Sequence, residues 1–256
     1  MQINGSTVLL TGASGGLGQA IARELARRGA PLVLTARNEA VLSELAEEVG
    51  GEVVVADLSR RADVDALCDR MADVDVLVCN AGVGGDGHQT EVSPDRIDTV
   101  LDVNLRAPMQ LSNAFARARI ASGRAGQIVM VGSVAGLVAA ANTSLYNATK
   151  FGLRGFTLAI RQDYAVHDIG VTHLAPGFIH TAGMFADNDM ELPPLVRARS
   201  PRDVAAAVAG AITNNPAEAW VIPPELRATA TLATIAPGLS ERLQRAMGIA
   251  DMTRDR

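Results

Sequence analysis

The chain has 256 residues, 48% hydrophobic and 20% charged, a composition typical of a folded domain rather than a disordered one. Its formal net charge of −5 and its scattered arginines argue against a nucleic-acid partner. The start has neither a basic segment nor a signal-like apolar run, and polar residues interrupt the longest uncharged stretch, 125–149. We therefore expect a cytoplasmic protein without a membrane span. Its two cysteines, Cys68 and Cys79, lack CxxC spacing and are interpreted as buried thiols.

Seven short apolar runs alternate with helical patterns along the chain. The expected strands are 7–10, 32–36, 52–56, 74–79, 127–131, 170–175 and 219–222. The helical patterns cover 17–28, 39–49, 60–72, 94–122, 144–168 and part of 181–214. Such alternation is typical of a parallel sheet, and strands that are apolar throughout indicate helices on both faces. We predict one α/β domain over 1–256, a Rossmann-type doubly wound parallel sheet with seven strands in three layers.

A glycine-rich stretch, "TGASGGLGQAIARELARRG" at 11–29, follows the first expected strand. Glycines permit a tight turn and let the backbone approach a diphosphate. A helix that begins near Leu17 directs its free N–H groups and its positive end at that anion. The stretch therefore predicts a dinucleotide site, although such a turn is sometimes merely structural.

The next two strand ends bear on the kind of dinucleotide. Enzymes that prefer NAD usually carry an acidic residue where this chain has Ala36, and Arg37 follows it. A guanidinium suits a 2′-phosphate, which favours NADP(H), with NAD(H) still possible. Arg37 as a solvated loop charge is the alternative. Asp57, after the third strand, is expected near the adenine, although Asp also commonly caps helices.

Lys150 is the only lysine; the other 22 basic residues are arginine. It follows Tyr146, one of two tyrosines, by four positions, so the two share a helical face. A nearby cation favours the phenolate and lowers the pKa of a phenol. Tyr146 is therefore predicted to exchange a proton with a substrate oxygen near neutral pH. An ordinary surface pair is the alternative, but it does not explain why arginine is absent there.

Together these motifs resemble the short-chain dehydrogenase/reductase family, in its shorter branch, over about residues 5–222. The matching residues are Thr11, Gly12, Gly16 and Gly18, then Asn80, Ala81 and Gly82, then Asn104, Ser133, Tyr146 and Lys150, and finally Pro176, Gly177 and Thr181. The adjacent Gly15 and Gly16 also fit the extended branch, but the chain length and "NAG" favour the shorter one. Many members that prefer NADP(H) have a basic residue at the position of Gly15, so that preference rests mainly on Arg37.

The resemblance implies hydride transfer between a nicotinamide and a carbon that bears oxygen. It implies that Tyr146 is the acid/base, that Ser133 hydrogen-bonds the substrate oxygen, and that Lys150 holds the ribose and lowers the Tyr146 pKa. It also implies a water anchored by Asn104 and a carboxamide contact from Thr181. The expected cofactor-binding set is Gly12, Ser14, Gly16, Leu17, Gly18, Arg37, Asp57, Leu58, Asn80, Ala81, Gly82, Tyr146, Lys150, Pro176, Gly177, Ile179 and Thr181.

Apolar residues expected near the substrate indicate a hydrophobic carbonyl compound or simply a packed lid: Val83, Val134, Leu145, Phe178, Met184, Phe185 and Leu192. A lid is predicted at about 178–200 and a helical extension at about 225–256. In that extension an apolar stripe is expected to pack on its own domain or on a twin subunit: Leu239, Leu243, Ala246 and Met247. None of the four histidines shows metal-ligand spacing: His88, His167, His173 and His180.

The family resemblance also implies a homodimer or homotetramer formed through helices that resemble 95–120 and 149–167. Two other functions compete with the carbonyl/alcohol oxidoreductase. A catalytically idle dinucleotide-binding sensor or scaffold would need the glycine loop but no proton donor beside the nicotinamide. An epimerase or dehydratase of the extended branch would need a larger carboxyl-terminal substrate region than this chain has.

Overall fold

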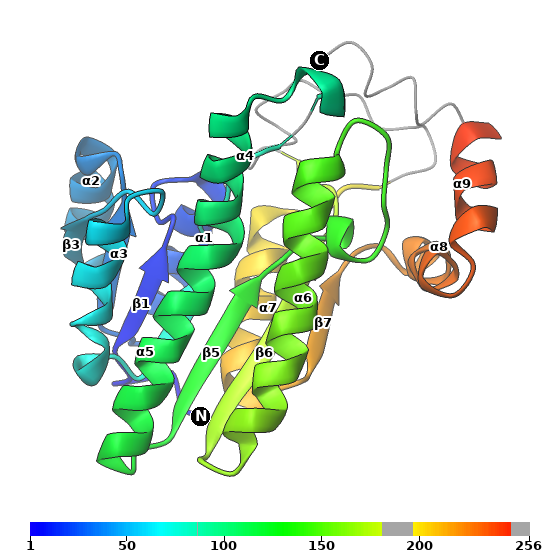
Figure 1. Cartoon of the computed structure of the whole chain (residues 1–256). Helices are drawn as coiled ribbons and strands as arrows, with labels where there is room; N and C mark the ends of the chain where they lie inside the picture. The colour runs from blue at the N-terminus through cyan, green and yellow to red at the C-terminus, as the bar shows by residue number, and fades with distance from the viewer. Residues whose placement is uncertain (86, 181–196, 247–256) are drawn as a thin grey trace.

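Seven strands form one parallel sheet, which confirms the predicted fold. The computed structural model describes residues 1–85, 87–180 and 197–246 (Figure 1). Across the sheet the order is β3, β2, β1, β4, β5, β6, β7, and every neighbouring pair is parallel. The strands are β1 Val8–Thr11, β2 Leu32–Ala36, β3 Glu52–Val55, β4 Val76–Cys79, β5 Gly126–Val131, β6 Ile169–Pro176 and β7 Glu218–Val221. The strand order reverses between β1 and β4, where such sheets form a ligand crevice.

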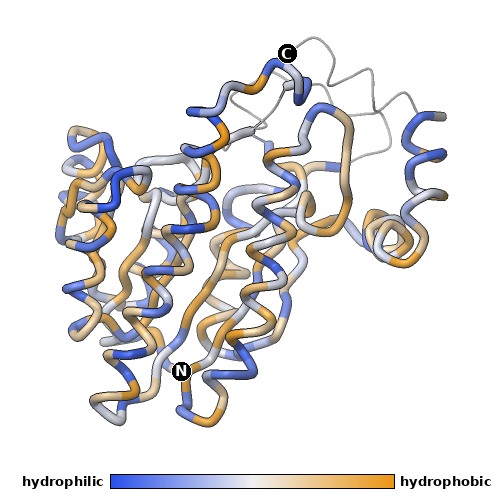
Figure 2. The backbone as a smooth tube through the Cα atoms, viewed as in Figure 1, coloured by the Kyte–Doolittle hydropathy of each residue, from blue (hydrophilic) through white to orange (hydrophobic). Residues whose placement is uncertain are grey.

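Helices cover both faces of this sheet and complete three layers (Figure 1). Within β1, Val8 and Leu10 contact the helices of one face, whereas Leu9 contacts those of the other. Burial on both faces explains why the central strands β1, β2 and β4 are hydrophobic along most of their length, whereas the edge strand β3 is exposed at both of its ends (Figure 2). The first face carries α1 Gly16–Arg27, α2 Glu39–Val49 and α7 Pro201–Asn214, and the second carries α3 Arg61–Cys68, α4 Pro94–Leu101, α5 Ala107–Ser122 and α6 Ser144–Ala165.

Two of the expected helices are not continuous α-helices. The pattern over 94–122 contains a π-helical turn, η3 Asp102–Arg106, between α4 and α5. A π turn inserts one extra residue, is frequent at functional sites, and here contains the buried Asn104. The pattern over 60–72 ends as a helix at Cys68 and continues as a 3₁₀ turn, η1 Met71–Asp73, that leads toward β4.

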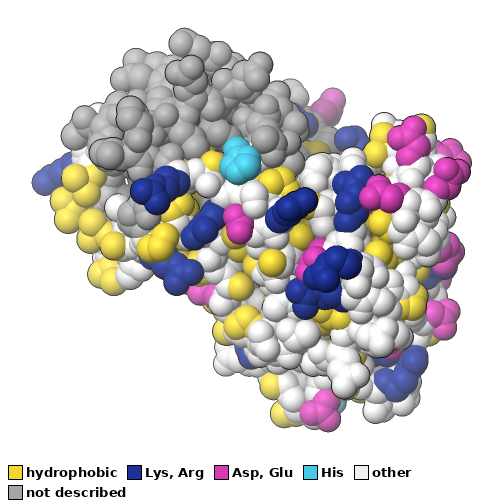
Figure 3. All heavy atoms as spheres, turned by 180° about the vertical axis from the view of Figure 1, so that it is seen from behind, with side chains coloured by type: hydrophobic (Ala, Val, Ile, Leu, Met, Phe, Trp, Pro, Cys, Tyr) yellow, Lys and Arg dark blue, Asp and Glu magenta, His cyan; other side chains and the backbone are white. Residues whose placement is uncertain are grey.

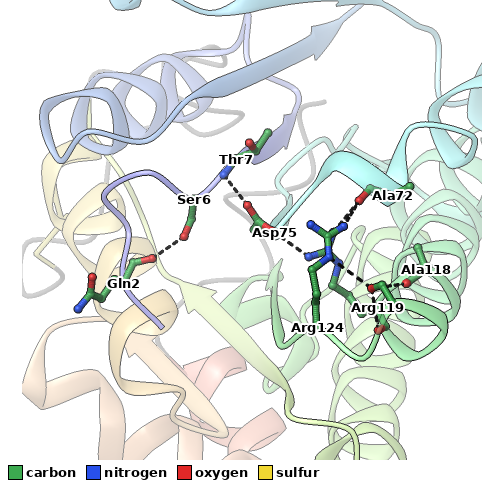
Figure 4. A network of polar contacts seen from close by, with 9 residues as sticks. Gln2, Ser6, Thr7, Ala72, Asp75, Ala118, Arg119 and Arg124 are labelled. Carbon is green, nitrogen blue, oxygen red and sulfur yellow. Dashed lines mark hydrogen bonds and ion pairs between the residues drawn. The ribbon is translucent and has the colours of Figure 1, made fainter.

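A polar network joins the elements at the amino ends of the strands (Figure 4). The fully buried Arg119 of α5 donates from Nη1 to Asp75 Oδ1 and from Nη2 to Ala72 O, both at 2.8 Å. The other carboxylate oxygen of Asp75 accepts from the backbone N–H of Thr7 at 3.0 Å. Arg124 donates to the same carbonyl of Ala72. These bonds tie α5 and the turn before β4 to the start of β1.

The carboxyl-terminal extension forms two helices, α8 Pro224–Ile235 and α9 Pro237–Ala246. Ala230 of α8 is buried against Leu137 and Ile222. In α9, by contrast, Leu239 and Leu243 remain 49% and 43% exposed, so the predicted packing of this stripe on its own domain is wrong for these two leucines. The stripe's last member, residue 247, lies outside the described residues. A twin subunit as the partner of the stripe stays a prediction.

Figure 3 shows basic and acidic side chains interspersed on the face behind Figure 1. Among the described residues, no helix combines the length and the apolar character that crossing a membrane requires.

The two cysteines differ in their exposure. Cys79 is buried, and burial raises its pKa to about 12, whereas Cys68 is only half-buried, contrary to expectation. Both are free thiols.

Candidate active site

The glycine turn after β1 has the shape of an anion cradle. Gly12 has φ +68°, and a Cβ there would lie 2.7 Å from the Ala81 Cα. A Cβ on Gly18 would lie 2.1 Å from the Gly12 carbonyl oxygen, so neither glycine can be replaced without moving backbone. No side chain caps α1 at Gly15, and its first turn contains no acidic residue. These features fit the diphosphate of a dinucleotide, which binds to backbone N–H groups at a helix N-terminus.

The residues around this turn hold it in place. Ser14 accepts a hydrogen bond from Gln19 Nε2 at 3.0 Å, and the half-buried Leu17 packs on the core. Asn80, just after β4, donates from Nδ2 to the carbonyls of Thr11 and Gly12 at 3.1 and 3.2 Å. The predicted asparagine thus braces the glycine turn.

Thr11 supplies a second brace that the expected site lacked. Its buried hydroxyl oxygen accepts from the backbone N–H groups of Asn80 and Ala81, both at 3.0 Å. The hydroxyl itself faces the carbonyl of Val78 at 3.5 Å. These bonds join the carboxyl ends of β1 and β4 at the reversal of strand order. In the sequence, the T-G motif marks this threonine and could have indicated its role.

Arg37 and Asp57 follow neighbouring strands, as predicted. Arg37 is exposed just beyond β2, and no side chain in the described ranges forms a hydrogen bond or ion pair with it. Asp57 Oδ1 accepts from the N–H and hydroxyl of Ser59, at 2.9 and 2.8 Å, rather than capping α3. Burial raises the Asp57 pKa, but these bonds and the charges of Arg37 and Arg60 outweigh it and hold the pKa below its usual range. The adjacent Leu58 is buried.

Lys150 and Tyr146 lie together on α6, as their spacing predicts. The Lys150 Nζ is 5.5 Å from the centroid of the Tyr146 ring and donates to the Val131 carbonyl at 3.3 Å. Tyr146 is half-buried, whereas Lys150 is only 3% exposed. Burial lowers the pKa of the Lys150 ammonium to about 8. The arrangement places a poorly compensated cation beside a phenol.

Asn104 and Gly82 complete this cluster from the η3 turn and the β4 end. The Asn104 Oδ1 accepts from the Val83 N–H at 2.8 Å, and its Nδ2 donates to the Val83 carbonyl and to Thr149 Oγ1. A Cβ on Gly82 would lie 3.4 Å from Asn104 Oδ1 and 3.5 Å from Lys150 Nζ. The side chain of Asn104 therefore fixes the loop after β4. The predicted water anchored by this residue stays a prediction.

Ser133, after β5, lies in the loop that precedes α6. Its Oγ accepts from the N–H of Ala135 at 3.1 Å, so the hydroxyl proton points elsewhere and is able to donate to a ligand. Asn147 was missed by the sequence analysis, although it lies inside "YNATK". Its Nδ2 donates to Ala135 O and Val138 O at 2.6 and 2.9 Å, and its Oδ1 accepts from Ala140 N. It ties the loop that contains Ser133 to the helix that contains Tyr146.

The segment after β6 is described only in part. Pro176 ends β6, the Gly177 N–H donates to Val221 O at 3.1 Å, and Ile179 is buried. A Cβ on Gly177 would lie 2.8 Å from the Ile222 side chain. Thr181, most of the predicted lid and three of the expected substrate-lining residues fall outside the described residues. Those residues are Met184, Phe185 and Leu192.

The loop after β4 packs closely on the start of α6, at the side where the substrate is expected. A Cβ on Gly85 would lie 3.1 Å from both the Leu145 Cγ and the Tyr146 N–H nitrogen. From the tail, Gln244 Nε2 donates to Ala139 O at 3.2 Å, within the loop that Asn147 fixes. The extension thus contacts the loop that Asn147 fixes, a contact that sequence periodicity did not predict.

Comparisons with known proteins agree with this fold. The family model described as short chain dehydrogenase matches residues 6–192. The ketoacyl reductase HetN of Nostoc sp. is 32% identical over 99% of this chain and 93% of its own length. The 3-oxoacyl-[acyl-carrier-protein] reductase FabG of Vibrio cholerae is 33% identical over 82% of this chain and 90% of its own. A short-chain dehydrogenase from Sphingobium yanoikuyae in complex with NADPH superposes with TM-score 0.76 at 28% identity, covering 92% of this chain and 95% of its own.

Proposed function

Because the chain belongs to the short chain dehydrogenase family and is thus an NAD(P)-dependent oxidoreductase of alcohol and carbonyl groups, we propose that it acts with NADP(H) and uses Tyr146 as acid/base. The observation that carries the proposal is the buried ammonium of Lys150 beside the Tyr146 ring. An ammonium near a phenol favours the ionised phenol. Near neutral pH, Tyr146 gives a proton to the oxygen of a carbonyl when it is protonated, and accepts one from an alcohol when it is ionised.

The dinucleotide is proposed to lie across the ends of β1, β4 and β6. Its diphosphate binds at the uncapped start of α1, where Gly12 and Gly18 leave room for it. Asp57 and Leu58 line the adenine side, and Pro176, Gly177 and Ile179 line the nicotinamide side, with Thr181 as a further predicted contact. When bound, the nicotinamide supplies hydride to a carbonyl carbon or takes it from an alcohol carbon.

The protein's own groups orient the reacting oxygen and its proton. Ser133 donates its hydroxyl proton to the substrate oxygen, because its Oγ already accepts from Ala135. Lys150 holds the ribose and favours ionised Tyr146. Asn104 keeps the loop after β4 against α6 and is proposed to anchor the water through which the proton is replenished.

The test of this mechanism is a panel of ketones, aldehydes, 3-oxoacyl thioesters and alcohols, followed by nicotinamide absorbance with both cofactors. Tyr146→Phe is expected to lower kcat by roughly 10²- to 10⁴-fold on any substrate found. Tyr164→Phe is the matched control, since Tyr164 lies on the same helix but outside the site. Unchanged turnover in Tyr146→Phe would reject the acid/base role.

The preference for NADP(H) is proposed from Arg37. Its exposed guanidinium forms no hydrogen bond or ion pair within the described residues and is suited to the 2′-phosphate. Arg37→Ala should raise the KM for NADPH by about 10- to 100-fold, as expected for lost charge-assisted hydrogen bonds, and leave that for NADH nearly unchanged. Arg61→Ala, an exposed arginine on α3, is the control. Equal efficiency of the wild type with NADH and NADPH would contradict the preference.

The substrate is proposed to be a largely apolar carbonyl compound. Val83, Val134 and Leu145 are the sequence neighbours of Gly82, Ser133 and Tyr146, and Leu145 is buried. Two relatives are named as ketoacyl or 3-oxoacyl reductases, so 3-oxoacyl thioesters are the first compounds to try. We further propose a cytoplasmic homodimer or homotetramer built through α5 and α6, where Ile120 and Phe151 are exposed. Sedimentation of the purified protein tests the oligomer.

A further inference from the structure

A histidine that this mechanism does not use lies close to Lys150. His173 on β6 is fully buried, and it pairs in register with Met130 of β5 and Glu218 of β7. Register partners in parallel strands project to the same face of a sheet, and Met130 belongs to the core on the face that α6 covers. His173 therefore lies between the sheet and the helix that carries Tyr146 and Lys150.

Charged groups contact the imidazole from the outer edge of the sheet. Nδ1 of His173 is 3.4 Å from Oε1 of Glu218. The Glu218 carboxylate also accepts two hydrogen bonds from Arg154, at 2.7 Å from Nε and 3.0 Å from Nη2. Arg154 follows Lys150 by four residues on α6, so both cations point to the same side of the helix. Arg154, Glu218 and His173 thus form a row that runs inward from the half-buried edge.

On the inner side the imidazole fits against a glycine. A Cβ on Gly132 would lie only 2.2 Å from Nε2 of His173, so the ring occupies the place of a side chain at 132. Gly132 lies between Val131, whose carbonyl accepts from Lys150, and Ser133. His173 therefore contacts the short segment that holds two groups of the proposed site.

The imidazole is neutral in this setting. Burial lowers the pKa of His173 well below its usual range, and the charges of Arg154 and Lys150 lower it further, against the opposing effect of Glu218. Among the described residues, α6 contributes these two cations and β7 contributes Glu218, whereas Met130 and Gly132 of β5 and its end do not titrate. The neutral ring therefore lies within electrostatic reach of both the buried ammonium and the carboxylate.

We propose that His173 is a positioning residue whose ring separates the Lys150 ammonium from the Glu218 carboxylate and so keeps that ammonium beside Tyr146. A buried ammonium is strongly attracted to a carboxylate, and the lysine side chain is flexible enough to follow that attraction. With the imidazole in place, Glu218 binds Arg154 and Lys150 donates to the Val131 carbonyl. This inference rests on the proposed role of Tyr146 as the proton donor and acceptor.

The titration of Tyr146 tests this directly and needs no substrate. The chain has two tyrosines, so Tyr164→Phe leaves Tyr146 as the only phenol, and its ionisation can be followed by ultraviolet absorbance of the cofactor-free protein. In this background His173→Ala is expected to raise the titration midpoint by about one pH unit, because Lys150 turns toward Glu218. Combining Glu218→Gln with His173→Ala should bring the midpoint most of the way back to that of the parent, since a neutral amide attracts the ammonium only weakly.

Two variants separate this role from simple packing. His173→Leu fills the space without polar atoms and should leave the midpoint near that of the parent, and so should Glu218→Gln alone. An unmoved midpoint in His173→Ala, or equal midpoints in His173→Ala with and without Glu218→Gln, would overturn the proposal. If the alanine variant does not fold, His173→Val replaces it with the same expectations. Fluorescence of Trp220, two residues beyond Glu218 on β7, reports that the local fold is intact.

Turnover on a substrate from the panel supplies a second readout. His173→Ala should lower kcat about tenfold, with little change in KM, because the lost effect acts on the proton step. The titration is independent of any substrate. Failure of Tyr146→Phe to slow turnover would therefore reject the proposed function alone, while an unmoved titration midpoint would reject the role of His173 alone.

Discussion

Two buried cations, one at each end of the sheet, have opposite surroundings. At the amino ends of the strands, Arg119 has a carboxylate and a carbonyl within 2.8 Å (Figure 4). At the carboxyl ends, Lys150 donates to one carbonyl, that of Val131, at 3.3 Å, and no carboxylate of the described residues forms an ion pair with it. The paired Arg119 joins α5 and the turn before β4 to the start of β1. The unpaired Lys150 ammonium, by contrast, lowers the stability of the fold and remains able to act on Tyr146. The proposed chemistry thus lies where the fold leaves a charge uncompensated.

The largest expected effect is that of removing the uncompensated charge. Lys150→Met should lower kcat by roughly 10²- to 10⁴-fold, because it removes the ammonium that favours the Tyr146 phenolate. The same change should stabilise the fold at neutral pH by up to about 3 kcal/mol, since burial lowers the Lys150 pKa from 10.5 to about 8. Urea unfolding and steady-state kinetics on the same preparations measure both effects.

The pH dependence of that stabilisation has a definite sign. The unfolded chain binds the Lys150 proton more tightly than the folded chain does, so the penalty is complete below pH 8 and vanishes as the pH rises through 10.5. The stability that Lys150→Met gains over the wild type should therefore decrease as the pH rises from about 8 to 10.5. A gain that is constant with pH would show that packing, not charge, is responsible.

At the amino ends of the strands, breaking the ion pair between Arg119 and Asp75 should lower the stability of the fold and leave the activity unchanged. Asp75→Ala leaves the Arg119 cation buried without its carboxylate, and should destabilise the fold by about 3–5 kcal/mol. Activity per folded molecule should be unchanged. The double variant Asp75→Ala/Arg119→Met is the control, because it removes both charges, and it should be more stable than Asp75→Ala. If the double variant were as unstable as Asp75→Ala, the loss could not be assigned to an unpaired buried charge on Arg119.

A smaller effect is expected from His173 in acid. Its pKa is lowered in the folded state, so the unfolded chain takes up a proton near pH ~6.5 that the folded chain does not bind. Stability should then fall as the pH drops below that value, by roughly 2 kcal/mol by pH ~5. His173→Leu should flatten this dependence. Chemical unfolding at a series of pH values provides the measurement, with equal slopes for both proteins as the contrary result.

The smallest effect on stability is expected for an ion pair on the solvent-exposed surface. Arg23 and Glu48 form two hydrogen bonds between α1 and α2, but their side chains are 48% and 51% exposed. Solvent and salt screen such pairs, so Glu48→Gln should leave the unfolding free energy nearly unchanged. Thermal unfolding at low and high salt checks this. A loss comparable to that of Asp75→Ala would remove the distinction between buried and exposed pairing.

Local patterns in the sequence predicted most of the fold and the centre of the site. Apolar runs located all seven strands, and the four-residue spacing of Tyr146 and Lys150 placed them together on α6. Motif positions also brought Gly82 and Asn104 to the same cluster. These predictions succeeded because helical and strand periods act over a few residues, and parallel strands bring their carboxyl ends to one edge.

Features that depend on distant partners were not predicted. The η3 turn widens a helix whose sequence reads as regular, and Leu239 and Leu243 stay half-exposed although their spacing suggests a buried stripe. The contact between His173 and Glu218 requires β6 and β7 to pair in one particular register. Periodicity carries no information about which strands become neighbours or where a lone polar side chain finds its partner.

The burial of the only lysine has a practical consequence for labelling. Amine-reactive reagents attack unprotonated amines that they can reach, and this chain offers just the terminal amino group and Lys150, which is 3% exposed. Native molecules should accept the label at the terminus alone, and a second label should appear only when the crevice around α6 opens. The rate of double labelling, read by mass spectrometry, would count those openings directly and would slow when a dinucleotide occupies the crevice.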